Sequence, residues 1–142
     1  MPDPAFMSYH HQHQLRVRYA ETDQMGFVYY GVYAQYYEVA RVEAMRAAGI
    51  NYASIERIHH IWMPVMHMNV RFLRPALYDD LLTIHTTVPS LPDWEIRFRY
   101  EIKNENGDLL NGALVQLCFL DAQTQKRINA PDFIKESLNS YF

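Results

Sequence analysis

The chain has 142 residues, of which 49% are hydrophobic and 20% are charged, and its formal net charge is −3. This length and composition predict one folded domain and exclude intrinsic disorder. The slight negative charge argues against nucleic-acid binding, because recognition of phosphates needs clustered Lys and Arg. No apolar run approaches the roughly 20 residues that cross a bilayer. The single cysteine, Cys118, excludes an internal disulfide and fits a reducing compartment. We therefore expect a cytoplasmic protein without a membrane span.

The first 13 residues show no periodicity and contain two prolines, so they are interpreted as a flexible N-terminal arm. Residues 14–142 are expected to form a single domain. The arm carries His10, His11 and His13, but three imidazoles without a carboxylate or cysteine partner are typical of adventitious metal binding. No native metal site is predicted.

The first regular element is expected at residues 14–20. Leu15, Val17 and Tyr19 alternate there with two arginines, which indicates a strand. The polar stretch that follows ends at Gly26 and is typical of a turn.

A long helix is predicted from Gly31 to Ala48, with Gly49 as its C-terminal cap. Its most apolar face carries Tyr33, Tyr36, Tyr37, Ala40, Ala44, Ala47 and Ala48. Valines and a methionine occupy much of the remaining circumference, so we expect the helix to be mostly enclosed. Residues 51–57 are expected to add a short helical turn.

After residue 60 the chain has a period of two, which predicts strands at 66–72, 82–88 and 94–102. Residues 109–120 are apolar on both faces around Gln116, which predicts a central strand. Asn106-Gly107 lies between the last two and indicates a hairpin, and residues 131–139 are expected to form a closing helix. These elements predict an α+β fold in which a curved antiparallel sheet wraps around the long central helix. One helix leaves sheet edges uncovered, so a homo-oligomer (dimer or tetramer) is expected.

The segment from Tyr19 to Tyr33 carries the chemistry. It sets Asp23 a few residues before the start of the long helix, where unpaired N–H groups and a partial positive charge suit a developing oxyanion. Gly26 allows a sharp turn, and Gly31 leaves the helix entrance open to a carbonyl. A carboxylate, backbone donors and apolar walls together suit acyl transfer.

A second interpretation stays open from the residues alone. Aspartate in Thr-Asp-x-x-Gly often forms a turn by accepting hydrogen bonds from backbone N–H groups. Glu21 lies two residues before Asp23, and on an extended segment the two carboxylates would point in opposite directions. Glu21 is therefore expected to be a solvated or salt-bridged loop residue.

The motif Asp23-x-x-Gly26-x-Val28-Tyr29-Tyr30-x-x-Tyr33 resembles the 4-hydroxybenzoyl-CoA thioesterase branch of the hot-dog-fold acyl-CoA thioesterases. The resemblance extends from Leu15 to Pro131. It includes Glu38, Arg41, Met63-Pro64-Val65 and the stretch Pro75-Ala76-x-Tyr78-Asp79-Asp80-x-Leu82. It implies the hot-dog fold, in which a sheet wraps around one helix.

The resemblance also implies roles for individual residues. Asp23 matches the catalytic carboxylate, and the backbone amide that polarises the thioester carbonyl matches Tyr30, with Gly31 next to it. Many aliphatic acyl-CoA members carry a histidine where this chain has Gly31, so no side-chain general acid is expected there. Substrate contacts are assigned to Gly26, Val28, Tyr29 and Tyr33. Trp62, Met63 and Pro64 are candidates for an acyl pocket, with plain core packing as the alternative.

The predicted function is hydrolysis of an acyl-CoA thioester to a free carboxylic acid and coenzyme A, without a cofactor. One alternative is a hot-dog hydratase or dehydratase, which needs a histidine that the Asp23 loop and the helix start do not supply. Another is a non-catalytic acyl-CoA sensor, which would not need a carboxylate near the helix N-terminus.

Overall fold

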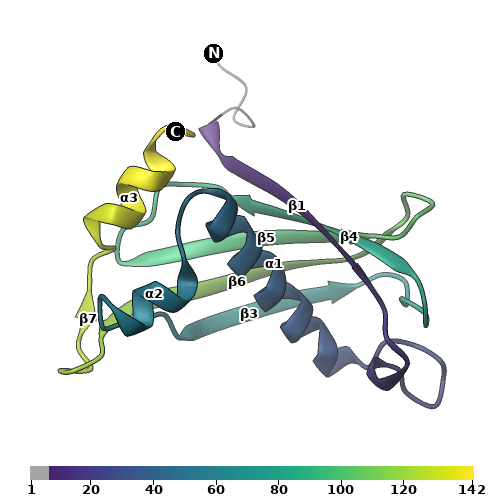
Figure 1. The fold of residues 1–142 in the computed structure, drawn as a ribbon. Coiled ribbons are helices and arrows are strands. Elements are labelled where there is room, and N and C mark those ends of the chain that lie inside the picture. The colour runs from purple at the N-terminus through teal and green to yellow at the C-terminus, as the bar shows by residue number, and fades with distance from the viewer. Residues whose placement is uncertain (1–6) are drawn as a thin grey trace.

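The computed structural model describes residues 7–142 and contains one seven-stranded antiparallel sheet with a long helix across one face (Figure 1). The strands are β1 (Tyr9–Arg16), β2 (Ile61–Trp62), β3 (Val65–Phe72), β4 (Leu81–Val88), β5 (Glu95–Lys103), β6 (Leu109–Asp121) and β7 (Arg127–Ile128). The helices are α1 (Tyr33–Ala47), α2 (Tyr52–Arg57) and α3 (Asp132–Asn139), with 3₁₀ turns η2 (Tyr19–Glu21) and η3 (Tyr30–Val32). The predicted α+β class and the long helix are confirmed.

The sheet is open and has the strand order β1-β4-β5-β6, with β3 and the short β2 paired to the far side of β6. Strand β6 is the longest, and it also pairs with β7 beyond the end of β5. Strands β1 and β3 are therefore the two long edges. Strands β3 to β6 lie within one residue of the predicted ranges. The side chains of β3, β4 and β5 alternate clearly in the sequence, whereas β6 is a largely apolar run.

The face of α1 toward the sheet is buried, and its buried residues are Tyr33, Tyr36, Tyr37, Ala40, Arg41, Ala44 and Met45. The opposite face is open, because Ala47 is exposed and 43% of Val39 is accessible. Within a single copy of the chain, the expectation that this helix is mostly enclosed is therefore wrong, because the sheet covers only one side of α1. Arg41, which looks like a surface residue in the sequence, is buried instead.

The flexible arm predicted for residues 1–13 is wrong from Tyr9 onward, where β1 pairs with β4. Residues 1–6 lie outside the described residues. The inward positions of β1 are held by Tyr9, His11 and His13, so polar histidines conceal the period-two pattern. The strand also ends at Arg16 rather than residue 20, because η2 turns the chain and leaves Tyr19 77% exposed.

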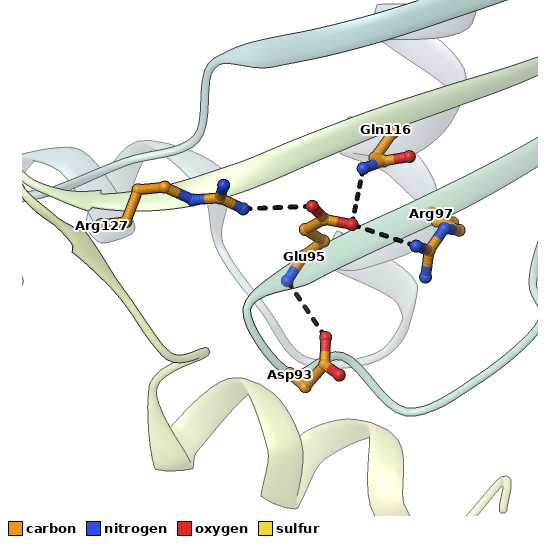
Figure 2. Close-up of polar contacts among 5 residues, drawn as sticks. All are labelled: Asp93, Glu95, Arg97, Gln116 and Arg127. Carbon is orange, nitrogen blue, oxygen red and sulfur yellow. Dashed lines mark hydrogen bonds and ion pairs between the residues drawn. The ribbon is translucent and has the colours of Figure 1, made fainter.

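The other face of the sheet is polar. Figure 2 shows a network there in which the Glu95 carboxylate accepts hydrogen bonds from Gln116, Arg97 and Arg127, while Asp93 accepts one from the Glu95 amide. These contacts tie together β5, β6 and β7 on the side away from α1. No helix among residues 7–142 is long and apolar enough to cross a membrane.

Candidate active site

The segment between β1 and α1 folds back on itself as a closed loop. An isolated bridge pairs Thr22 with Val28, and the Asp23 amide donates to the Phe27 carbonyl at 2.8 Å. Gly26 closes the turn with φ of +81°. The Val28 amide donates to the Ala76 carbonyl at 2.9 Å, which anchors the loop to the segment before β4.

The two oxygens of Asp23 have different surroundings. Oδ1 accepts hydrogen bonds from the amides of Met25 at 2.9 Å and Phe27 at 3.3 Å, as the turn interpretation requires. Oδ2 has no hydrogen-bond partner among residues 7–142, and the side chain is only partly buried. One oxygen therefore shapes the turn while the other is free to meet a substrate, so the two interpretations of Asp23 are compatible.

The start of α1 presents unpaired backbone donors. In η3 the first internal bonds are donated by Val32 and Tyr33, so the N–H groups of Tyr30 and Gly31 have no acceptor within the described chain. Such groups carry the partial positive charge of a helix start and can stabilise an oxyanion. A Cβ on Gly31 would come within 3.0 Å of the Tyr29 ring, so glycine keeps this entrance uncrowded.

A cleft of about 290 Å³ opens beside Asp23, between the loop, the start of α1 and the end of β3. Four rings form much of its wall, those of Phe27, Tyr30, Tyr33 and Phe72. Tyr33 and Phe72 pack with ring centroids 5.5 Å apart, and burial raises the pKa of the Tyr33 hydroxyl. The cleft can accept an apolar or aromatic group.

A second, more open cleft of about 680 Å³ lies on the other side of the loop. It is bordered by Tyr19 and Tyr78, whose rings meet edge to face with centroids 5.4 Å apart. Asp23 lines both clefts. An extended molecule could therefore occupy both sides of the loop with its reacting atom near this carboxylate.

The structure gathers most of the predicted site residues at this loop. Val28, Tyr30 and Tyr33 line the smaller cleft with Asp23, and Gly26 lines the larger one. Tyr29 lines neither; its ring is half exposed and packs against Tyr30, with centroids 4.7 Å apart.

Trp62, Met63 and Pro64 lie elsewhere within one chain. They precede β3, whereas the cleft adjoins Phe72 at the other end of that eight-residue strand. At about 3.3 Å per residue, the two ends are roughly 25 Å apart. Met63 is buried, and Trp62 and Pro64 are exposed.

The sequence motif does not identify Met25, Phe27, Phe72 and Leu73, which also line the smaller cleft. The last two belong to the end of β3 and the residue after it, far from the motif along the chain. A bridge between Phe27 and Leu77 brings the two segments together. The described residues contain no group of three or more His, Cys, Asp or Glu side chains that could hold a metal ion.

Comparisons with known proteins identify the family and the fold. The family model for the thioesterase superfamily matches residues 25–111. Acyl-CoA thioester hydrolase YbgC of Escherichia coli is 33% identical over 114 residues, covering 79% of this chain and 83% of that protein. A 1,4-dihydroxy-2-naphthoyl-CoA hydrolase of Thermosynechococcus vestitus is 25% identical over 90% of this chain and 88% of its own. The solved structure of DHNA-CoA thioesterase from Staphylococcus aureus has a TM-score of 0.81 and 32% identity, covering 84% of this chain and 80% of that one. The hot-dog fold is thereby confirmed.

The turn at Gly26 supplies a test of the loop geometry. Gly26→Ala places a side chain at φ of +81° with nothing within 4 Å of its Cβ, so the expected cost is conformational strain of about 1–2 kcal/mol. We expect a lower free energy of unfolding and faster hydrogen exchange at the Met25 and Phe27 amides. Gly49→Ala is the matched control, since Gly49 has φ of +87° and equally open surroundings at the far end of α1. Gly49→Ala should lower the free energy of unfolding by a similar amount and leave the Met25 and Phe27 amides protected. Equal hydrogen-exchange rates at these two amides in both variants would contradict this account.

Proposed function

Because the chain belongs to the thioesterase superfamily, and is thus a thioester-hydrolysing enzyme, we propose that it converts an acyl-CoA thioester into a free carboxylic acid and coenzyme A. The observation that carries this proposal is the unpartnered Asp23 Oδ2 close in sequence to two unpartnered amides at a helix start. The names of the relatives support coenzyme A as the thiol. Membership of the family favours hydrolysis over a non-catalytic sensor or a hydratase.

In the proposed reaction the thioester carbonyl lies against the N–H groups of Tyr30 and Gly31. Asp23 accepts a proton from a water molecule, whose oxygen attacks the carbonyl carbon and forms a tetrahedral oxyanion. The C–S bond then breaks, the acyl group leaves as the carboxylic acid, and the proton passes to the departing thiolate. The two amides stabilise the oxyanion more strongly than the neutral carbonyl, which lowers the barrier.

Direct attack by Asp23 on the thioester is the alternative, and it would form a mixed anhydride. A single turnover in ¹⁸O-labelled water can establish the covalent route. Label found in the Asp23 carboxylate would establish the covalent route, because water activation never opens a bond to that carboxylate.

The acyl group is proposed to occupy the smaller cleft, whose walls are largely apolar and aromatic. The larger cleft is then available for the arm of coenzyme A. Gly26 and Val28 shape the loop between the clefts, while Tyr33 forms part of the acyl wall. Tyr29 is proposed to contact substrate from the rim, where its ring lies against Tyr30.

A second copy of the chain is proposed to complete the site. Strand β3 is an edge strand whose apolar side chains are about half exposed, as Met66, Met68 and Phe72 show. Such an edge is open to pairing with another strand. Antiparallel pairing with the same strand of a second copy would carry the partner subunit's Trp62 toward the acyl cleft. This arrangement would reconcile the predicted role of Trp62, Met63 and Pro64 with their distance from Asp23 in one chain.

Replacing the Asp23 carboxylate tests the catalytic assignment. Asp23→Asn keeps the size and the turn-forming oxygen but removes the base, so kcat should fall by ~10²–10⁴ while KM changes little. Release of coenzyme A from a panel of acyl-CoA substrates, followed with a thiol reagent, measures this.

Asp121→Asn is the matched control for this experiment. Asp121 Oδ1 accepts the amides of Gln123 and Thr124 in another turn, as Asp23 does in its own, but it lies at the end of β6. The kcat of the Asp121→Asn variant should stay at the native value. A folded Asp23→Asn protein with more than a tenth of native activity would defeat the assignment.

The acyl cleft predicts a dependence on chain length. Each buried methylene contributes about 0.8 kcal/mol, so kcat/KM should rise about four-fold per methylene until the cleft is full, and then fall. Rates measured across straight-chain acyl-CoAs from acetyl to dodecanoyl, and for benzoyl-CoA, would show this maximum. A flat profile would contradict a bounded apolar cleft.

The proposed dimer predicts a mass of twice 16.8 kDa by light scattering at micromolar concentration. Met68→Lys places a charge on the exposed edge at β3 and should shift the protein toward monomers with reduced kcat/KM. Gln12→Lys changes an exposed residue of the opposite edge strand, β1, and should leave the dimer intact. A native protein that scatters as a monomer would rule the dimer out.

A further inference from the structure

Glu21 is a buried carboxylate that the proposed reaction does not use. It is 8% exposed, and its two oxygens receive three hydrogen bonds. The Arg18 amide donates at 2.8 Å, the Arg18 guanidinium at 3.0 Å, and the hydroxyl of Tyr36 on α1 at 3.0 Å. The expected salt bridge is therefore present, but with a buried rather than a solvated carboxylate.

Glu21 faces away from the proposed reaction centre. It lines a separate cleft of about 300 Å³ with Arg18 and Tyr36, whereas Asp23 lines the two other clefts and not this one. The two carboxylates thus point to different sides, as their spacing predicts. A direct role for Glu21 at the thioester is excluded by this placement.

The ionised form of Glu21 is favoured, and this form is a permanent hydrogen-bond acceptor. Burial alone disfavours the carboxylate, but the hydrogen bonds from Arg18 and Tyr36 outweigh burial and lower the pKa of Glu21. Burial and the neighbouring carboxylate together raise the pKa of the Tyr36 hydroxyl. At neutral pH the link is therefore a neutral donor on a charged acceptor, the stronger class of hydrogen bond.

The main chain of Glu21 connects this link to the catalytic groups. The Glu21 carbonyl accepts the Tyr29 amide at 2.9 Å, and Tyr29 immediately precedes the proposed oxyanion donor Tyr30. Two residues after Glu21, the Asp23 amide donates to Phe27 on the same returning limb of the loop. The bond between Glu21 and Tyr29 is thus a cross-link between the limb that carries Asp23 and the limb that carries the Tyr30 amide.

We propose that Glu21 is a positioning residue, which the Tyr36 hydroxyl holds against α1 so that the Asp23 carboxylate stays in register with the Tyr30 amide. This inference rests on the proposed function, because it assumes that Asp23 and Tyr30 act on one thioester. Errors of about 1 Å between reacting groups can cost up to about 100-fold in rate, so a loosened cross-link should reduce kcat.

The next residue of α1 provides a matched control. Tyr37 is also buried, and its hydroxyl donates one hydrogen bond, to Asn111 Oδ1 of β6 at 2.6 Å. Tyr36→Phe and Tyr37→Phe therefore remove the same atom from neighbouring buried positions. Both should lower stability, Tyr36→Phe by more because its acceptor is charged, but only Tyr36→Phe loosens the loop.

The experiment compares these variants with Glu21→Met, which removes both carboxylate oxygens at similar side-chain length, and with the double variant Glu21→Met/Tyr36→Phe. Hexanoyl-CoA and benzoyl-CoA serve as substrates, and the one that the native enzyme hydrolyses faster is used throughout. We expect Tyr36→Phe and Glu21→Met each to lower kcat about ten-fold with KM within two-fold, and Tyr37→Phe to keep kcat within two-fold. The double variant should be no slower than the slower single variant, because both changes break one link.

Hydrogen exchange supplies a second readout that does not depend on activity. The Tyr29 amide should exchange faster in Tyr36→Phe than in Tyr37→Phe at equal global stability. Equal kcat in Tyr36→Phe and Tyr37→Phe, or additive losses in the double variant, would overturn the inference while leaving the role of Asp23 intact. An active Asp23→Asn protein would instead refute the proposed function. If Tyr36→Phe does not fold, Glu21→Met alone decides, and native kcat in that variant refutes the positioning role.

Discussion

The fold depends on tyrosine hydroxyls that need hydrogen-bond partners at the buried face of α1. A buried phenol that lacks a partner is costly, and four of the buried tyrosines gain a partner by bonding to a neighbouring element. Tyr36 donates to Glu21 of the loop, and Tyr37 donates to Asn111 of β6. Tyr33 accepts the Ala76 amide before β4, and Tyr9 of β1 donates to the Ala44 carbonyl at 2.6 Å. Four of the 11 tyrosines thus have a structural reason. Because these contacts are directional, they set the rotation of the helix over the sheet, which apolar packing alone leaves adjustable.

In the proposed function, Asp23 and Glu21 divide structure and chemistry within one short segment. Each carboxylate accepts backbone N–H groups, so each would look structural if it were considered alone. The two differ in their remaining contacts. Glu21 is enclosed and both of its oxygens accept hydrogen bonds, whereas Asp23 lines two clefts and one of its oxygens has no partner within residues 7–142. A carboxylate that is anchored by one oxygen has a fixed direction, and this is the preorganisation that proton transfer needs.

Much of the fold could be predicted because most strands alternate apolar and polar side chains, as Ile96, Phe98, Tyr100 and Ile102 do in β5. The start of β1 escaped prediction because His11 and His13 occupy inward positions that apolar residues usually fill. At the site, the motif located Asp23 and Tyr30 since both lie on one continuous loop. Phe72 and Leu73 could not be found in this way, because tertiary packing, rather than sequence spacing, brings the end of β3 to the loop. The burial of Arg41 and Glu21 was missed for the same reason. A charged residue is expected to be exposed unless its partner, or the element that covers it, is known.

The connectivity of the sheet has a consequence for how the chain folds. Strands β5 and β6 are joined by a tight turn at Gly107, so their pairing closes a short loop and costs little entropy. Strand β1, in contrast, pairs with β4 only after the whole of α1, α2 and β3 has been spanned. Pairings between strands that are far apart in the sequence form late, because the entropy of closing the long loop is lost before the stabilising contacts form. The loop that carries Asp23 follows β1 directly, and it is therefore among the last segments to reach its native shape. A nascent chain in which the β5–β6 hairpin has already formed would still have no organised carboxylate, so catalytic competence would report completion of folding rather than the presence of secondary structure.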